Sequence, residues 1–88
     1  MDYKQEGSKL RTEFKNLIYN FMKNSAECQK YAEGLKQSEI FRNCGMDWGE
    51  KQNATSTNQQ YWIVALLREL EEENKIQRDC VNKKWRLK

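Results

Sequence analysis

The C-terminal third of the chain begins with a stretch, residues 57–75, that reads TNQQYWIVALLRELEEENK. Thr57 and Gln60 have the spacing of a capping box, in which two side chains satisfy free backbone amides at the start of a helix. A nearly continuous apolar run then extends to Leu70, as in a helix that is buried among others. Because neither glycine nor proline follows in the chain, the pattern predicts one helix over residues 57–87.

A helix of that extent would be roughly 46 Å long at about 1.5 Å per residue, which is longer than a domain of this size covers. Its apolar side chains partly follow a heptad, the repeat of coiled coils. The run from Leu70 to Asn74 is similar to dimerising segments of coiled-coil scaffolds. We therefore expect two copies to pair along a seam in this helix, formed by Ile63, Leu67, Leu70, Asn74 and Val81.

Two shorter helices are expected ahead of it. Residues 8–24 have the i, i+4, i+7 spacing of an amphipathic helix. Asn24 and Glu27 have the spacing of a second capping box, which predicts another helix over residues 25–42. Six apolar residues of the first helix are expected to face the core: Leu10, Phe14, Leu17, Ile18, Phe21 and Met22. Two more are expected to enter the core from the last turn of the second helix: Ile40 and Phe41.

A loop is predicted over residues 43–56, where two glycines and several asparagines interrupt every periodic pattern. Met46 and Trp48 lie inside it. These two side chains either anchor the loop on the domain or form an exposed contact for a partner, since tryptophan is enriched at binding hot spots. Both interpretations stay open on the sequence alone.

These patterns predict an all-α fold with a three-helix arrangement, in which a helical hairpin packs on a long C-terminal helix with coiled-coil character. The 88 residues form a single helical domain over residues 1–88, either entire or as a module of a larger protein. Only 38% of the residues are hydrophobic, so the core is thin or is completed by a second chain.

Several kinds of chemistry lack the residues that they need. The absence of histidine removes the commonest general base and the commonest metal ligand. Cys28, Cys44 and Cys80 have no zinc-site spacing, and their odd number argues for a reducing compartment. We expect no enzymatic activity, no cofactor and no metal site. The lack of a long apolar run or a secretory signal predicts an intracellular, cytoplasmic protein without a transmembrane segment.

The C-terminal end concentrates positive charge around an aromatic residue. Lys83, Lys84 and Arg86 flank Trp85, within a chain whose net charge is +3. Such a cluster can grip phosphates and stack on a base, which indicates nucleic-acid binding. It also suits a solvated helix end, an acidic protein surface or an anionic lipid.

The function expected from the sequence is a non-enzymatic interaction and dimerisation module of the scaffold or adaptor type. Its partners would be a second copy of itself and another protein. The alternative is a small helical nucleic-acid-binding protein that uses the basic C-terminal end.

Overall fold

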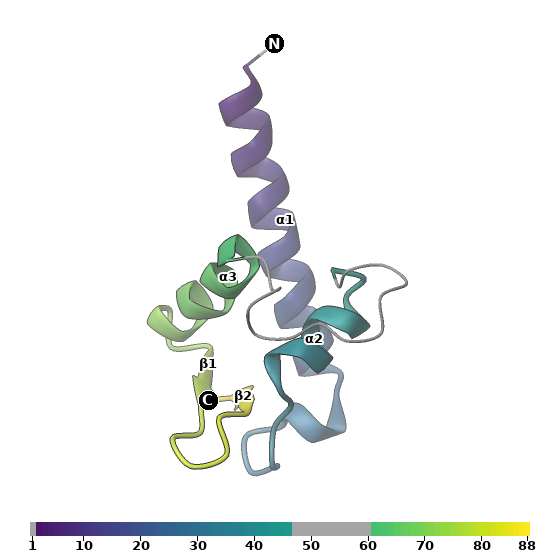
Figure 1. Cartoon of the computed structure of the whole chain (residues 1–88), viewed down its shortest axis with the longest axis vertical. Coiled ribbons are helices and arrows are strands. Elements are labelled where there is room, and N and C mark those ends of the chain that lie inside the picture. The colour runs from purple at the N-terminus through teal and green to yellow at the C-terminus, as the bar shows by residue number, and fades with distance from the viewer. Residues whose placement is uncertain (1, 47–60) are drawn as a thin grey trace.

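The structure, a computed structural model, describes residues 2–46 and 61–88 (Figure 1). Within these residues the chain forms three α-helices, one short 3-10 turn and two strands. In chain order they are α1 (Tyr3–Lys23), η1 (Ala26–Cys28), α2 (Gln37–Asn43), α3 (Tyr61–Glu72), β1 (Ile76–Arg78) and β2 (Trp85–Leu87).

The expected all-α fold is wrong, because the C-terminal segment is not one long helix. The helix predicted over residues 57–87 ends at Glu72, and β1 and β2 form a two-stranded antiparallel sheet after it. Its register pairs Ile76 with Leu87 and Arg78 with Trp85. The fold is therefore a mixed one, with helices packed beside a small β-hairpin.

Asn74 is the residue that ends α3. Its φ of 62° is left-handed, a conformation that asparagine tolerates better than most residues. The amide of Lys75 donates to the carbonyl of Leu70 at 3.0 Å, and that of Asn74 donates to Glu71 at 3.0 Å. These bonds are those of a Schellman motif, which satisfies the last helical carbonyls and turns the chain. Asn74 thus closes the helix, where the heptad had assigned it to a dimer seam.

The helix predicted over residues 25–42 is also wrong. Asn24 caps the end of α1, and its backbone amide donates to the carbonyls of Asn20 and Phe21. After η1 the chain makes a turn over residues 29–32, and from there to the end of the predicted helix only Gln37–Asn43 is α-helical. The first helix is longer than predicted and starts at Tyr3, because the Asp2 side chain accepts a hydrogen bond from the Gln5 amide at 3.1 Å.

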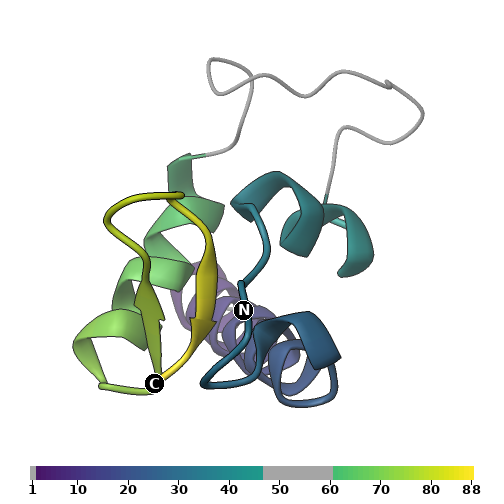
Figure 2. The same cartoon turned by 90° about the horizontal axis from the view of Figure 1, so that it is seen from below.

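The core lies between α1 and the elements that pack against it (Figure 2). The helix α3 and the hairpin lie on one side of the core, and α2 lies on the other. The expectation that Ile40 and Phe41 enter the core is confirmed. Leu10 and Leu17 of α1, in contrast, are exposed instead of core-facing, because the packed elements cover only one side of that helix. The buried hydrophobic residues are Ile18, Met22, Cys28, Ile40, Phe41, Leu66, Leu67, Leu70, Ile76 and Trp85.

A close backbone approach joins the two halves of the described chain. The amide of Leu35 donates to the carbonyl of Trp85 at 2.9 Å, and the amide of Trp85 donates back to Leu35 at 2.7 Å. Gly34 precedes this contact with a φ of +94°, and a Cβ there would lie 2.7 Å from the Trp85 carbonyl oxygen. Glycine is therefore required at position 34 for two reasons, its left-handed backbone and the lack of space.

Gly34→Ala should destabilise the protein by about 3 kcal/mol or more, since it combines backbone strain with a steric clash. Gly45→Ala is the matched control, because Gly45 has a φ of +73° but nothing within 4 Å of its added Cβ. It should cost only the strain, about 1–2 kcal/mol. Urea denaturation of both variants measures the difference, and equal losses would contradict the role of the Leu35–Trp85 contact.

Candidate functional site: two surfaces

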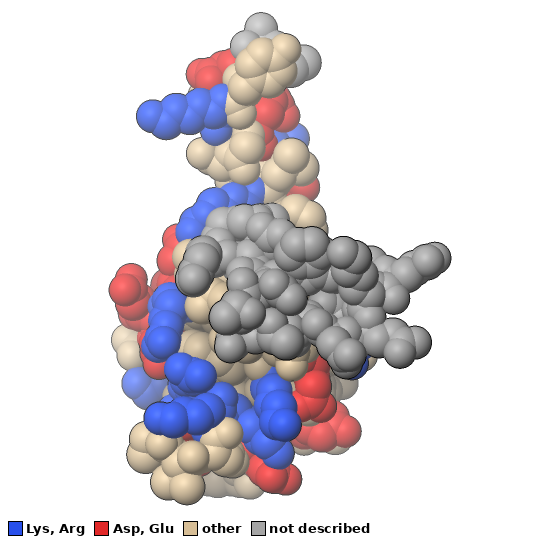
Figure 3. Space-filling model, viewed as in Figure 1, with Lys and Arg blue, Asp and Glu red and all other residues tan. Residues whose placement is uncertain are grey.

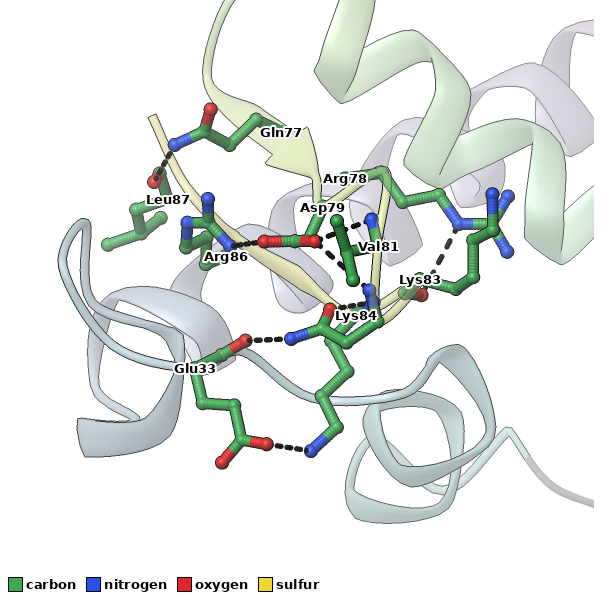
Figure 4. Close-up of polar contacts among 10 residues, drawn as sticks. Glu33, Gln77, Arg78, Asp79, Val81, Lys83, Lys84, Arg86 and Leu87 are labelled. Atoms are coloured by element: carbon green, nitrogen blue, oxygen red, sulfur yellow. Dashed lines mark hydrogen bonds and ion pairs between the residues drawn. The ribbon is translucent and has the colours of Figure 1, made fainter.

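The turn between β1 and β2 is built around the carboxylate of Asp79 (Figure 4). One of its oxygens accepts from the amides of Val81 at 2.7 Å and Asn82 at 3.0 Å, and the other pairs with Arg86 at 3.0 Å. Lys83 completes the turn with a left-handed φ of 64°. Side-chain hydrogen bonding of this kind to nearby amides is what makes aspartate a turn former. The Asp79 carboxylate thus stabilises a hairpin turn in the segment that the sequence predicted as the end of a helix.

The hairpin is also tied to the segment that precedes α2. Lys84 Nζ lies 2.7 Å from Glu33 Oε1, and the side-chain amide of Asn82 donates to the Glu33 carbonyl at 3.4 Å (Figure 4). The Lys84 ammonium lowers the pKa of the Glu33 side chain, mainly through the hydrogen bond that it donates to this carboxylate. Lys84 and Arg86, two of the cations predicted to bind a partner, are therefore already paired with carboxylates of the same chain.

Trp85 does not form an exposed stacking platform. Its side chain is 0% exposed, and the guanidinium carbons of Arg68 and Arg78 lie 5.5 and 5.6 Å from the ring centroid. Cation–π attraction favours this arrangement, while the ring fills the centre of the core. A base could not reach the indole without opening the fold.

A positively charged surface nevertheless remains at the hairpin. Arg68 and Arg78 meet at Trp85, and the side chain of Arg78 donates to the carbonyl of the exposed Lys83 at 3.3 Å. Arg68 is partly balanced by Glu71, which lies 3.3 Å away. In Figure 3, lysine and arginine side chains gather over the lower part of the molecule, where Figure 1 places the hairpin. We call Arg68, Arg78 and Lys83 the basic surface.

A second surface, which the sequence patterns did not predict, lies on α1. The cap residue Asp2 and residues 3–10 of this helix are all exposed and project away from the packed elements (Figure 1). Three large apolar side chains with a spacing of seven form a stripe along α1: Tyr3 is 79% exposed, Leu10 53% and Leu17 45%. We call these three residues the α1 stripe. The signal that could have found it is the seven-residue spacing, once Asp2 is taken as the N-cap.

The predicted dimer seam is not brought together on one helix. Leu67 and Leu70 are buried in the core of their own chain, Asn74 lies in the turn after α3, and Val81 is 86% exposed at the hairpin turn. The side chain of Ile63 lies outside the described residues. The seam had assumed a helix that continues to residue 87, and that helix ends at Glu72.

The two loop candidates differ in what the structure describes. Met46 is partly buried against the core, and its amide donates to the carbonyl of Phe41 at 2.8 Å. This placement favours an anchoring role for Met46. Trp48 lies outside the described residues, as does the capping box predicted at Thr57 and Gln60.

The three cysteines are free thiols that differ in exposure. Burial raises the pKa of Cys44 to about 11, and burial likewise raises that of Cys28. Both thiols therefore stay protonated near neutral pH, whereas Cys80 is exposed on the hairpin. Over residues 2–46 and 61–88, no group of three or more potential ligand side chains is placed to hold a metal ion.

Comparison with protein-family models, with curated protein sequences and with solved structures found no match to this chain. Within the described part of the chain, none of the helices has the length and apolar character needed to cross a membrane.

The pKa of Asp79 provides a test of the hairpin turn. The amides of Asn82 and Val81, together with Arg86, hold this pKa at about 2. Because it lies below the value of about 3.9 in an unfolded chain, the charged form stabilises the fold above about pH 4, and this stability is lost as the pH falls toward 2. Asp79→Asn removes the charge and should remove this part of the pH dependence.

The measurement is the urea midpoint of wild type and Asp79→Asn between about pH 7 and pH 2. The advantage of the wild type should shrink toward the acid end of this range. Glu72→Gln, at the exposed end of α3, controls for the loss of a surface carboxylate. If the urea midpoint of Asp79→Asn changes with pH in the same way as that of the wild type, the charged carboxylate of Asp79 does not stabilise the turn.

Proposed function

We propose that the chain is a non-enzymatic protein-interaction module that dimerises through the projecting part of α1. The observation that carries this proposal is the α1 stripe, an apolar row on a helix whose exposed first turns project away from the packed elements. Apolar side chains aligned at heptad spacing are the contact surface of paired helices. The dimerisation expected from the sequence is thereby retained, with a different helix as its contact element.

The cost of leaving this helix end alone supports the proposal. Residues 3–10 are all exposed, so this end of α1 depends on helix propagation from the anchored part, which is only weakly favourable for each added residue. Gly7 adds to that cost by about 1 kcal/mol relative to alanine, and nothing lies within 4 Å of the Cβ that it lacks. The Asp2 cap is the one described side-chain contact that supports the first turn. Packing against a partner helix would supply the missing stabilisation.

The base of α1 is held firmly enough to present such a surface. Arg11 pairs with Glu69 of α3, and Lys15 Nζ lies 2.7 Å from Oε2 of Glu73, the residue that follows this helix. Ile18 and Met22 are fully buried below them. The direction of the projecting helix is thus set by the core, which lowers the cost of orienting it on binding.

The setting proposed for this interaction is intracellular. Cys28, Cys44 and Cys80 are all free, and two of them have raised pKa values that make them poor nucleophiles. An odd set of free thiols is usual in a reducing compartment. Neither the free thiols nor the paired carboxylates call for a catalytic role.

The first test is the solution mass of the chain by light scattering at two concentrations. We expect a mass near twice 10.6 kDa at the higher concentration. Leu10→Asp should weaken the dimer at least about tenfold, because it removes one apolar side chain per copy and buries a charge. Ser8→Asp is the control, since residue 8 lies about 200° around the helix from residue 10.

Both variants should keep the urea midpoint of the monomer, since residues 8 and 10 are both exposed. Ser8→Asp should still dimerise. A wild-type mass of one chain at both concentrations would contradict the proposal, and so would equal effects of the two substitutions.

A second candidate function is nucleic-acid binding at the basic surface. The observation that favours it is the gathering of Arg68, Arg78 and Lys83 at the hairpin. With Trp85 buried, the protein would bind phosphates without stacking on a base. Binding of this kind weakens steeply as salt concentration rises.

This candidate predicts binding to duplex or single strands at about 50 mM salt, measured by fluorescence anisotropy. Arg68→Gln combined with Lys83→Asn should weaken binding and lower the salt slope by about 1 for each phosphate that is no longer bound. Asparagine is chosen at position 83 because it tolerates the left-handed backbone there. Lys4→Gln with Lys9→Gln removes the same charge from α1, so an equal reduction in affinity would exclude a site at the hairpin.

A further inference from the structure

We infer that the partner of the projecting helix is a second copy of this chain, aligned parallel and in register. This inference rests on the proposed function and adds the orientation of the pair. It follows from the heptad positions of α1 and from the signs of the charges that flank the α1 stripe.

The α1 stripe forms one of the two rows that a coiled-coil seam requires. With Tyr3, Leu10 and Leu17 at the d positions, Gly7 and Phe14 occupy the a positions between them. Phe14 is partly buried against the core of its own chain, so the two helices would meet most closely from Tyr3 to Leu10 and diverge beyond it. Residues 3–10 are the part of α1 in which every residue is exposed.

The flanking charges are segregated by sign. Lys4 and Arg11 fall at the e positions on one side of the stripe, and Glu6 and Glu13 fall at the g positions on the other. In a parallel pair, a g residue lies beside the e residue of the next heptad on the partner helix, which places Glu6 next to the partner's Arg11. Two-fold symmetry produces this ion pair twice.

An antiparallel pair would bring like charges together. In that orientation e positions face e positions and g positions face g positions. Lys4 and Arg11 would then line one side of the interface and Glu6 and Glu13 the other, with repulsion on both sides. The charge pattern therefore discriminates between the two orientations, and it favours the parallel one.

Arg11 already pairs with Glu69 of its own chain, and this pairing is compatible with a further partner. The guanidinium offers five N–H donors, and 41% of the Arg11 side chain is still exposed. Glu6 lies in the exposed first turn of α1. Arg11 would then bind Glu69 of its own α3 and Glu6 of the second copy at the same time, and so link α3 through α1 to the partner helix.

Position 7 gives the sharpest test, because a parallel register places each Gly7 opposite its copy. Gly7→Cys in a Cys80→Ser background removes the exposed native thiol and puts a new one at the a position. With oxidised glutathione as the oxidant, we expect most of this variant to form a disulfide-linked dimer. Ser8→Cys in the same background is the control, since its side chain points away from the seam.

The solution mass of the Cys80→Ser chain alone is first measured at the same concentrations. If the Cys80→Ser chain has the mass of a single copy, this result contradicts both the proposed function and the inferred parallel pair. A dimer that crosslinks no better through Gly7→Cys than through Ser8→Cys contradicts only the parallel register. A dimeric mass, together with crosslinking at least about tenfold faster through Gly7→Cys than through Ser8→Cys, would support the proposed function and the parallel register.

Discussion

The reciprocal backbone hydrogen bonds between Leu35 and Trp85 are the contact on which the described fold depends. They join the segment ahead of α2 to the C-terminal hairpin, and they bring the Trp85 ring into the centre of the core. Gly34 makes this approach possible because a larger residue would collide with the Trp85 carbonyl. A small chain with few apolar residues thereby obtains one large buried side chain that touches several elements.

The burial of Trp85 also decides which surfaces remain for interaction. Arg68 and Arg78 pack beside its ring, and Lys84 and Arg86 are held by Glu33 and Asp79 as the hairpin docks. Most of the positive charge near the C-terminus therefore has a structural role. The packed elements cover only one side of α1 and leave its first turns bare. This asymmetry is the reason why we propose the helix, and not the basic end, as the first candidate site for a partner.

Part of this arrangement could be predicted from the distribution of apolar residues along the chain. An amphipathic first helix, a buried segment around Leu66, Leu67 and Leu70, and the entry of Ile40 and Phe41 into the core all appear in the structure. Strands of three residues have no such signal, because they are too short to show a period. Asn74 was ambiguous for a different reason, since asparagine occurs both at coiled-coil a positions and as a left-handed helix stop.

The sequence by itself determined which side chains favour burial, the amphipathic character of α1 and the lack of histidine. Only the tertiary structure decided which face of α1 is covered and which cations are paired. Burial preference is a property of each residue, whereas pairing depends on segments about 50 positions apart, such as Glu33 and Lys84. The free α1 stripe and the buried Trp85 both result from those long-range contacts.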